Sequence, residues 1–139
     1  MDYKEKIDNN AENSPRLHRL QRIKYLYRFF LLKIDKNVAK QEVIDNFQII
    51  FKNEIEINSM LNLIDNIDEL VEKIIKQLKG DWSWERINPI KKAILINGAY
   101  EILMLEIPRA ITTNEAMEIA RIYIPGEDIK FINGCLDNL

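Results

Sequence analysis

The residues best able to do chemistry in this sequence form a basic run near the N-terminus. Arginine suits bidentate contacts to phosphate and stacking on bases, and each phosphate contact would release counterions. Tyr25 and Tyr27 lie within the run, and single-stranded RNA is usually bound by stacking on such rings. The run therefore predicts an RNA-binding surface, while a solvated helix face with its tyrosines in the core is the alternative. Its basic residues, with no acid among them, are Arg16, Arg19, Arg22, Lys24 and Arg28.

The sequence offers little to a catalytic or metal-binding role. Cys135 and His18 are the only residues of their kinds, so a zinc site of several such ligands cannot be built within one chain. Phosphate-binding loops, nucleophile elbows and paired-carboxylate motifs are absent from the sequence. Thr112 and Glu115 have the spacing of a capping box, which we interpret as a helix start and not as part of an active site. We expect no enzyme activity, no cofactor and no metal.

Length and composition indicate one domain. The chain has 139 residues, and its net charge of −2 gives nucleic acid no general attraction. Residues 1–13 hold four acids and two lysines, and we expect a disordered acidic arm there, ahead of a single domain over residues 14–139. A lone cysteine indicates a reducing cytoplasm, and the sequence has no signal-peptide core and no apolar run long enough to span a bilayer. We predict a cytoplasmic protein with no membrane partner.

Apolar residues recur at spacings of three and four along most of the chain, which predicts an all-α fold. Ser14 and Pro15 predict the start of the first helix, since serine caps and proline loses no useful donor there. That helix is apolar on nearly every face in its second half, so we expect it at the centre of the core. Gly80 predicts the end of the third helix, and we interpret Trp82 and Trp84 beyond it as packing residues. The predicted helices span about 15–34, 38–52, 57–79, 89–105, 112–123 and 128–139.

Several segments resemble the NusB family. Residues 113–121 (TNEAMEIAR) resemble its INEAVELAK stretch, and residues 131–137 (FINGCLD) resemble its FVNGVLD. Residues 82–87 fit the family pattern W-x-x-x-R-L, and residues 93–102 fit its AILRLAxYEL helix. The first helix also has the Arg-rich start leading to Leu-Tyr. In order and spacing the motifs cover essentially all of the chain after the acidic arm.

The resemblance implies a helical bundle of two packed subdomains and a non-enzymatic role in transcription antitermination. It implies binding of boxA-type RNA together with NusE, a small-subunit ribosomal protein, within the RNA polymerase antitermination complex, which promotes ribosomal RNA transcription. Self-association into a homodimer is left open.

The resemblance also adds a second candidate RNA contact near the C-terminus. In the family an aromatic residue at the position of Phe131 lies near the RNA, beside an acid that Glu127 or Asp128 would supply here. From the residues alone, Phe131 is equally well an anchor of the last helix. The predicted RNA-binding residues are Arg16, Arg19, Arg22, Lys24, Tyr27, Arg28, Lys130 and Phe131.

The chain departs from the family pattern at three positions. Ile96 stands where an arginine is usual, Lys91 replaces an acid on the surface thought to face NusE, and Arg22 occupies a position that is commonly small. Two alternative functions stay open at this point. One is a NusB-like domain of a ribosomal RNA cytosine methyltransferase, and the other is a protein-only adaptor without RNA binding.

Overall fold

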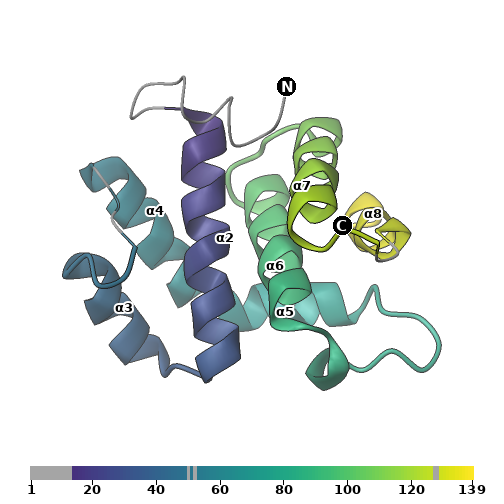
Figure 1. The fold of residues 1–139 in the computed structure, drawn as a ribbon, viewed down its shortest axis with the longest axis horizontal. Coiled ribbons are helices and arrows are strands. Elements are labelled where there is room, and N and C mark those ends of the chain that lie inside the picture. Colours follow the sequence, from purple (N-terminus) through teal and green to yellow (C-terminus); the bar gives the residue numbers. More distant parts are fainter. Residues whose placement is uncertain (1–13, 50, 52, 127–128) are drawn as a thin grey trace.

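A computed structural model of the chain describes residues 14–49, 51, 53–126 and 129–139, and its regular elements in this part are all helices (Figure 1). The all-α prediction is confirmed. The predicted acidic arm, residues 1–13, lies outside the described residues. In chain order the helices are α2 (Pro15–Leu32), α3 (Lys36–Ile44), α4 (Glu54–Asp65), α5 (Ile67–Ile75), the 3₁₀ helix η1 (Trp84–Arg86), α6 (Pro89–Leu103), α7 (Arg109–Tyr123) and α8 (Lys130–Asp137).

Helix α2 begins where its sequence predicts. The Ser14 hydroxyl accepts a hydrogen bond from the backbone N–H of Leu17, and Pro15 occupies the first turn. The helix ends at Lys33, which adopts the left-handed conformation with φ of 54°, so α2 stops just short of the predicted end. Eighteen residues of regular helix thus carry the basic run across the molecule.

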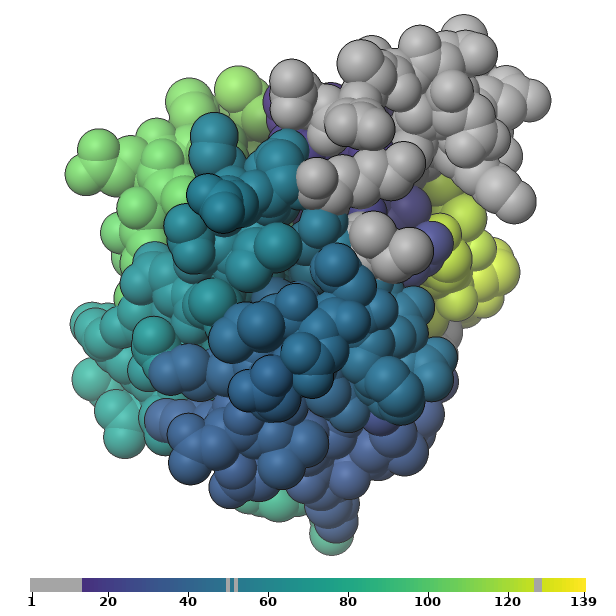
Figure 2. All heavy atoms as spheres, turned by 90° about the vertical axis from the view of Figure 1, so that its left-hand side faces the viewer, coloured from purple at the N-terminus to yellow at the C-terminus, as the bar shows by residue number. Residues whose placement is uncertain are grey.

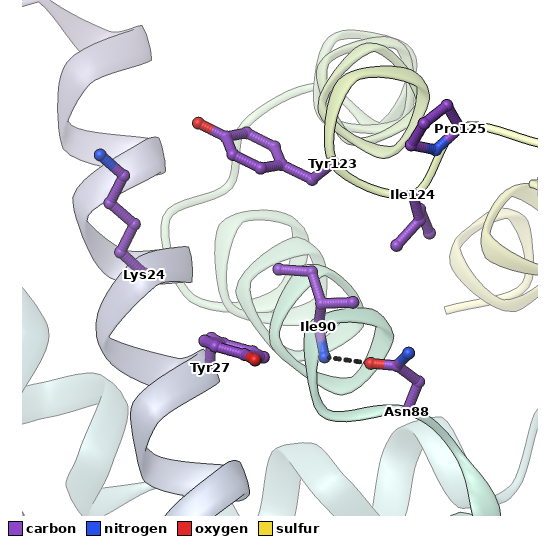
Figure 3. Close-up of a pocket in the computed structure, with 7 residues that line it drawn as sticks. All are labelled: Lys24, Tyr27, Asn88, Ile90, Tyr123, Ile124 and Pro125. Atoms are coloured by element: carbon purple, nitrogen blue, oxygen red, sulfur yellow. Dashed lines mark hydrogen bonds between the residues drawn. The ribbon is translucent and has the colours of Figure 1, made fainter.

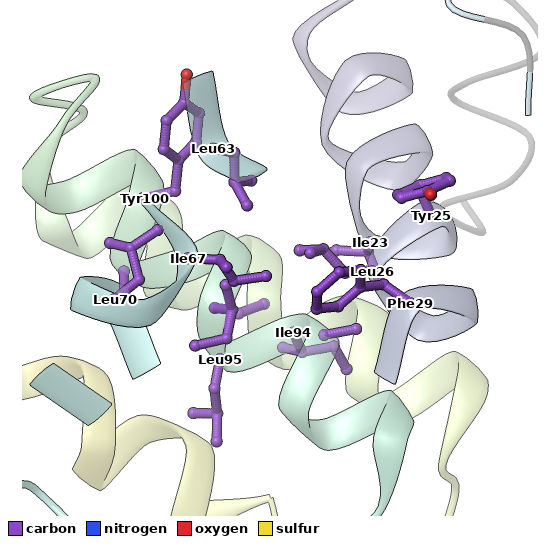
Figure 4. Packing of buried hydrophobic residues seen from close by; sticks show 14 of the residues in the cluster. Ile23, Tyr25, Leu26, Phe29, Leu63, Ile67, Leu70, Ile94, Leu95 and Tyr100 are labelled. Carbon is purple, nitrogen blue, oxygen red and sulfur yellow. The ribbon is translucent and has the colours of Figure 1, made fainter. Parts of the chain in front are cut away.

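Helices α2 and α6 form the centre of the fold, with α5, α7 and α8 packed on α6 (Figure 1). The Asn88 side chain caps α6 by accepting from the N–H of Ile90, and every residue from 93 to 101 is buried. Figure 4 shows Ile23 and Leu26 of α2 pointing toward Ile94 of α6 in this core. The α2–α6 contact therefore joins a first group of helices, α2 to α4, to a second, in which α5, α7 and α8 pack on α6.

The predicted third helix is wrong, because it is two helices. Asn66 ends α4, and its side-chain amide donates to the backbone oxygen of Asn62 at 2.8 Å. The two helices have different neighbours: α4, before the break, packs against α3, whereas α5, after it, packs against α6. Each helix buries its own apolar face. The last buried residues of α4 are Leu63 and Ile64, and the first buried residue of α5 is Ile67. The apolar spacing runs on through Asn66, so the pattern alone does not reveal the change of direction.

The predicted second helix is too long. It ends at Ile44, and Asn46 and Gln48 then turn the chain with φ of 53° and 71°. Positions 50 and 52 of the predicted helix lie outside the described residues. Seen from the side in Figure 2, the α3 and α4 segments occupy most of one face of the molecule.

Helix α8 approaches α6 closely at Gly98. A Cβ atom built on this glycine would lie 2.8 Å from Cδ2 of Leu136, so only glycine admits the contact as it stands. Within the residues described, no helix has both the length and the apolar character needed to cross a membrane.

Candidate nucleic-acid interface

The basic run on α2 is divided by the fold into buried and exposed side chains. Arg19 and Arg22 are each only 4% exposed. Arg16 and Arg28 are half-buried, and Lys24 is exposed. Because these residues share one helix but not one face, the structure does not bring the predicted run together as a single patch.

Arg19 forms a bidentate ion pair with Glu101 of α6, whose side chain is fully buried. The guanidinium Nε and Nη2 atoms donate to the two carboxylate oxygens at 2.8 and 2.7 Å. The hydroxyl of Thr112, from α7, donates to the same carboxylate at 3.0 Å. A planar fork on a carboxylate is the strongest geometry available to an arginine pair.

Arg22 belongs to the same buried group. Its Nε donates to Oδ1 of Asn97 at 2.7 Å and its Nη2 to Glu101 at 3.2 Å. The Asn97 amide donates in turn to Glu101 at 2.7 Å. Burial opposes ionisation of Glu101, but the hydrogen bond from Arg19 and the charges of Arg19 and Arg22 outweigh it and hold the pKa of that carboxyl below its ordinary value. The two arginines thus neutralise a carboxylate inside the bundle.

Burial removes the geometric support for Arg19 and Arg22 as RNA contacts. The guanidinium group of Arg19 faces Glu101 of α6 and Glu115 of α7, and that of Arg22 faces α6 and Glu56 of α4, so we leave both arginines out of the proposed interface. Local sequence cannot reveal this, because their partner Glu101 lies 82 and 79 positions away. Only the folded structure shows that arginines of the basic run pair with a buried carboxylate.

Arg16 and Arg28, near the two ends of α2, each face a carboxylate at the edge of the bundle. Arg16 lies 2.9 Å from Glu115 of α7. Arg28 donates from Nε and Nη2 to Glu42 of α3 at 3.1 and 3.0 Å, and it lies over the ring of Phe47. Both would have to exchange part of these contacts for a phosphate, so they are weaker candidates than an exposed lysine.

The capping box predicted at Thr112 and Glu115 is wrong. Helix α7 already begins at Arg109, directly after Pro108, and Thr112 lies inside it. Thr112 instead donates to Glu101, and Glu115 pairs with Arg16. Both residues therefore hold α7 against its neighbours, and the predicted end of α7 at Tyr123 is confirmed.

Lys24 and Tyr27 line an open groove of about 640 Å³ between α2, the start of α6 and the end of α7 (Figure 3). Tyr27 is 40% exposed and Tyr123, on the opposite side, is 43% exposed. Figure 3 shows the Lys24 ammonium and the Tyr123 hydroxyl at the same end of the groove, with Tyr27 facing Ile90. The predicted alternative, in which the tyrosines lie in the core, holds for Tyr25 alone, which is fully buried.

Lys130 and Phe131 lie elsewhere, at the start of α8. The Phe131 ring packs against Trp82, with ring centroids 4.8 Å apart and an angle of 30° between the planes. This pair lines a second hollow that shares no residue with the groove at Lys24. The acids predicted beside Phe131, at positions 127 and 128, lie outside the described residues.

Two exposed aromatic residues of these hollows, Tyr123 and Trp82, were not among the predicted site residues. Tyr123 ends α7 and reaches the groove only because α7 packs on α6. The only local signal was an aromatic ring at a helix end or in a connector, which is more often a packing residue. Tertiary structure alone places both rings beside predicted site residues.

The described residues contain neither a metal-binding cluster nor an exposed thiol. No group of three or more His, Cys, Asp or Glu side chains there has the arrangement of a metal site. Cys135 is buried, and burial raises the pKa of its thiol to about 11, so the reactive thiolate is disfavoured.

Comparison with known proteins identifies relatives along most of this chain. The model of the NusB family matches residues 16–139. The transcription antitermination protein NusB of Methylacidiphilum infernorum (isolate V4) is 39% identical over 89 residues, covering 63% of this chain and 62% of that protein. Those of Helicobacter pylori (strain Shi470) and Helicobacter acinonychis (strain Sheeba) are each 35% identical over 107 residues, covering 77% of this chain and 74% of theirs. No solved structure is a significant match.

Proposed function

The chain belongs to the NusB family, and on that premise we propose that it is a transcription antitermination factor that binds boxA-type RNA together with NusE. In this role it joins the RNA polymerase antitermination complex and promotes transcription of ribosomal RNA. The single observation that carries the proposal is the family match, which extends over residues 16–139. The proposed factor is non-enzymatic, in keeping with relatives whose names give transcription antitermination as their role.

We place the meeting point of RNA and NusE at the groove between α2, α6 and α7. Lys24 supplies a positive charge for a phosphate, and the exposed rings of Tyr27 and Tyr123 supply stacking faces for bases. Ile90 forms part of the opposite wall and is followed in α6 by Lys91, on the surface predicted to face NusE. One groove thus offers cationic and aromatic groups to RNA and an apolar wall to a protein.

The test is fluorescence anisotropy of a labelled boxA-type RNA, titrated with the protein alone and with NusE at several salt concentrations. Lys24→Glu should flatten the dependence of log affinity on log salt by about 0.7 for one lost contact to a single strand. Tyr27→Ala should weaken binding about 10-fold with little change in that slope. The matched control is Lys73→Glu, an exposed charge reversal on α5 away from the groove, which should leave binding unchanged.

Failure to bind RNA, with and without NusE, by a protein of full helicity would contradict the proposal. The apolar side chains of Ile90, Ile124 and Pro125 in the groove would then favour the second candidate, a protein-only adaptor. That candidate requires NusE to bind this chain without RNA, and Ile90→Asp to abolish the complex. None of the observations favours a methyltransferase-associated domain.

A further inference from the structure

The outer face of α3 carries an open hollow of about 320 Å³. Its lining residues share one face of the helix, apart from the last, which follows in the turn after α3: they are Val38, Gln41, Glu42, Asp45 and Phe47. Val38 is 53% exposed and Phe47 is 48% exposed. Helix α3 already buries Ala39 and Val43 against the rest of the fold, so Val38 and Phe47 belong to a second, outward apolar surface.

Contacts within the chain hold two of these side chains in place. The backbone N–H of Phe47 donates to the backbone oxygen of Glu42 at 2.9 Å, and the Arg28 guanidinium lies 5.1 Å from the centre of the Phe47 ring. Arg28 and the hydroxyl of Tyr25 both donate to the Glu42 carboxylate. The ring and the carboxylate are therefore positioned before any partner binds, which lowers the entropy cost of binding.

The hollow also carries negative charge. The hydrogen bond from Arg28 is the main cause that holds the pKa of Glu42 below its ordinary value, so this carboxylate is ionised at neutral pH. Asp45 accepts from the side-chain amide of Gln41 at 3.0 Å, a neutral donor that leaves its charge in place. Asp45 is also the C-cap of α3, where the helix dipole disfavours an acid and favours a cation. Helix stability therefore does not account for Asp45, and the hollow is suited to a positive group.

We propose that this hollow binds an amphipathic helix of a partner protein, with an apolar side chain between Val38 and Phe47 and a lysine or arginine beside Asp45. Grooves that bind such helices combine apolar contacts with charges opposite to those of the partner. Ligand pockets have volumes of roughly 300–1,000 Å³, so a hollow at the lower end of that range suits one or two side chains. Phosphates of RNA would meet Glu42 and Asp45, so the charge favours a basic protein segment over RNA.

This surface and the proposed RNA groove lie on opposite sides of α2. Figure 1 shows α3 on one side of α2, with α6 and α7 on the other, and Figure 2 looks onto the α3 side. The hollow on α3 and the groove at Lys24 share no residue. A partner helix and RNA can therefore bind one molecule at the same time. The inference goes beyond the proposed function and does not depend on it.

The test is an NMR titration of the full ¹⁵N-labelled chain with a synthetic amphipathic peptide made only of leucine and lysine. The peptide should shift the amide signals of α3 and of the turn at Phe47, and its affinity should fall as salt is raised. A peptide with glutamate in place of lysine should not bind. Val38→Gln should weaken binding of the leucine–lysine peptide about 10-fold through lost apolar contact. Asp45→Lys should weaken binding and remove most of its salt dependence.

Two exposed positions on α5 provide matched controls. Ile75→Gln repeats the apolar-to-amide change at a side chain that is 43% exposed, and Glu72→Lys repeats the charge reversal. Both controls should bind the peptide like the wild type. Val38 and Asp45 are exposed, and a lysine is favoured at the end of α3, so both test variants should keep the wild-type melting temperature.

Several results would overturn the inference. Equal affinity for the leucine–lysine and leucine–glutamate peptides would do so, as would wild-type affinity in Val38→Gln and Asp45→Lys. Shifts of the same amide signals by boxA-type RNA would assign this face to RNA. Concentration-dependent shifts without peptide, abolished by Val38→Gln, would assign it to a second copy of the chain. RNA titrations of Lys24→Glu test the groove separately, so either proposal can fail alone.

Discussion

The buried carboxylate of Glu101 gives the strongest test of how the fold uses its arginines. Glu101→Gln keeps the side-chain shape but removes the negative charge that faces Arg19 and Arg22. In the folded chain Glu101 accepts five hydrogen bonds, two from Arg19 and one each from Arg22, Asn97 and Thr112. Removing one partner of a buried ionic group costs about 3–5 kcal/mol when the remaining charges lose their compensation. Here Arg19 keeps Glu115 at 3.8 Å and Arg22 keeps Glu56 at 3.6 Å, so we expect the lower end of that range.

A native protein has a free energy of unfolding of about 5–15 kcal/mol, so the expected loss is a large share of the total stability. Urea unfolding followed by circular dichroism measures it directly. With an m-value of about 2 kcal/mol per molar urea, a loss of about 3–5 kcal/mol lowers the unfolding midpoint by about 1.5–2.5 M. An unchanged m-value would show that the folded state is simply less stable.

Glu115→Gln is the matched control, since Glu115 also faces Arg16 and Arg19 but at the edge of the bundle. The Arg16 and Glu115 side chains are 25% and 14% exposed, so their pair should contribute about 1 kcal/mol or less. Equal midpoints for Glu101→Gln and Glu115→Gln would refute the reasoning. By the same logic Arg19→Glu would place a second carboxylate beside Glu101, so that variant tests folding and not RNA binding.

Three further outcomes follow from buried groups. Gly98→Ala should lower the free energy of unfolding by about 1–3 kcal/mol, because its Cβ meets the buried Leu136, whereas Gly134→Ala should raise it by about 0.5–1 kcal/mol. A thermal melt in which Gly98→Ala is as stable as Gly134→Ala would contradict the packing. Cys135 should resist a thiol reagent at mildly alkaline pH until urea unfolds the chain, and rapid labelling of the native protein would disprove its burial. The pKa of Glu101 is lowered in the folded state, so the stability that its charge contributes is complete at neutral pH and is lost as pH falls from the ordinary carboxyl pKa through the folded one. The urea midpoint should therefore fall less steeply with decreasing pH for Glu101→Gln than for the wild type.

Periodicity predicted the elements whose signals are local. The cap at Ser14, the proline after it and the apolar faces of α2 all lie within one helix, and the start and central position of that helix are confirmed. The break at Asn66 was missed because apolar spacing continues through it, while the reason for the break lies in which neighbours α4 and α5 pack against. The choice between two neighbours is a tertiary effect that a local window does not contain.

Candidate site residues were predictable as residue types but not as exposed groups. Arg19 and Lys24 look equivalent in the sequence, yet one meets Glu101 in the core and the other lines an open groove. Trp82 and Trp84 differ in the same way, since only Trp84 has Phe30 and Lys92 around it. Charge and ring type are read directly from a sequence, whereas exposure depends on partners far along the chain.

The hydrogen bond between Arg22 and Asn97 also constrains which substitutions this chain can accept during evolution. The two side chains meet across 75 positions of sequence, one on α2 and one on α6. A small residue in place of Arg22 would leave Asn97 and Glu101 facing an empty, polar gap, which an apolar residue at position 97 would fill better. Substitutions at positions 22 and 97 are therefore expected to be tolerated as a pair more readily than singly, so the identity of one should carry information about the other.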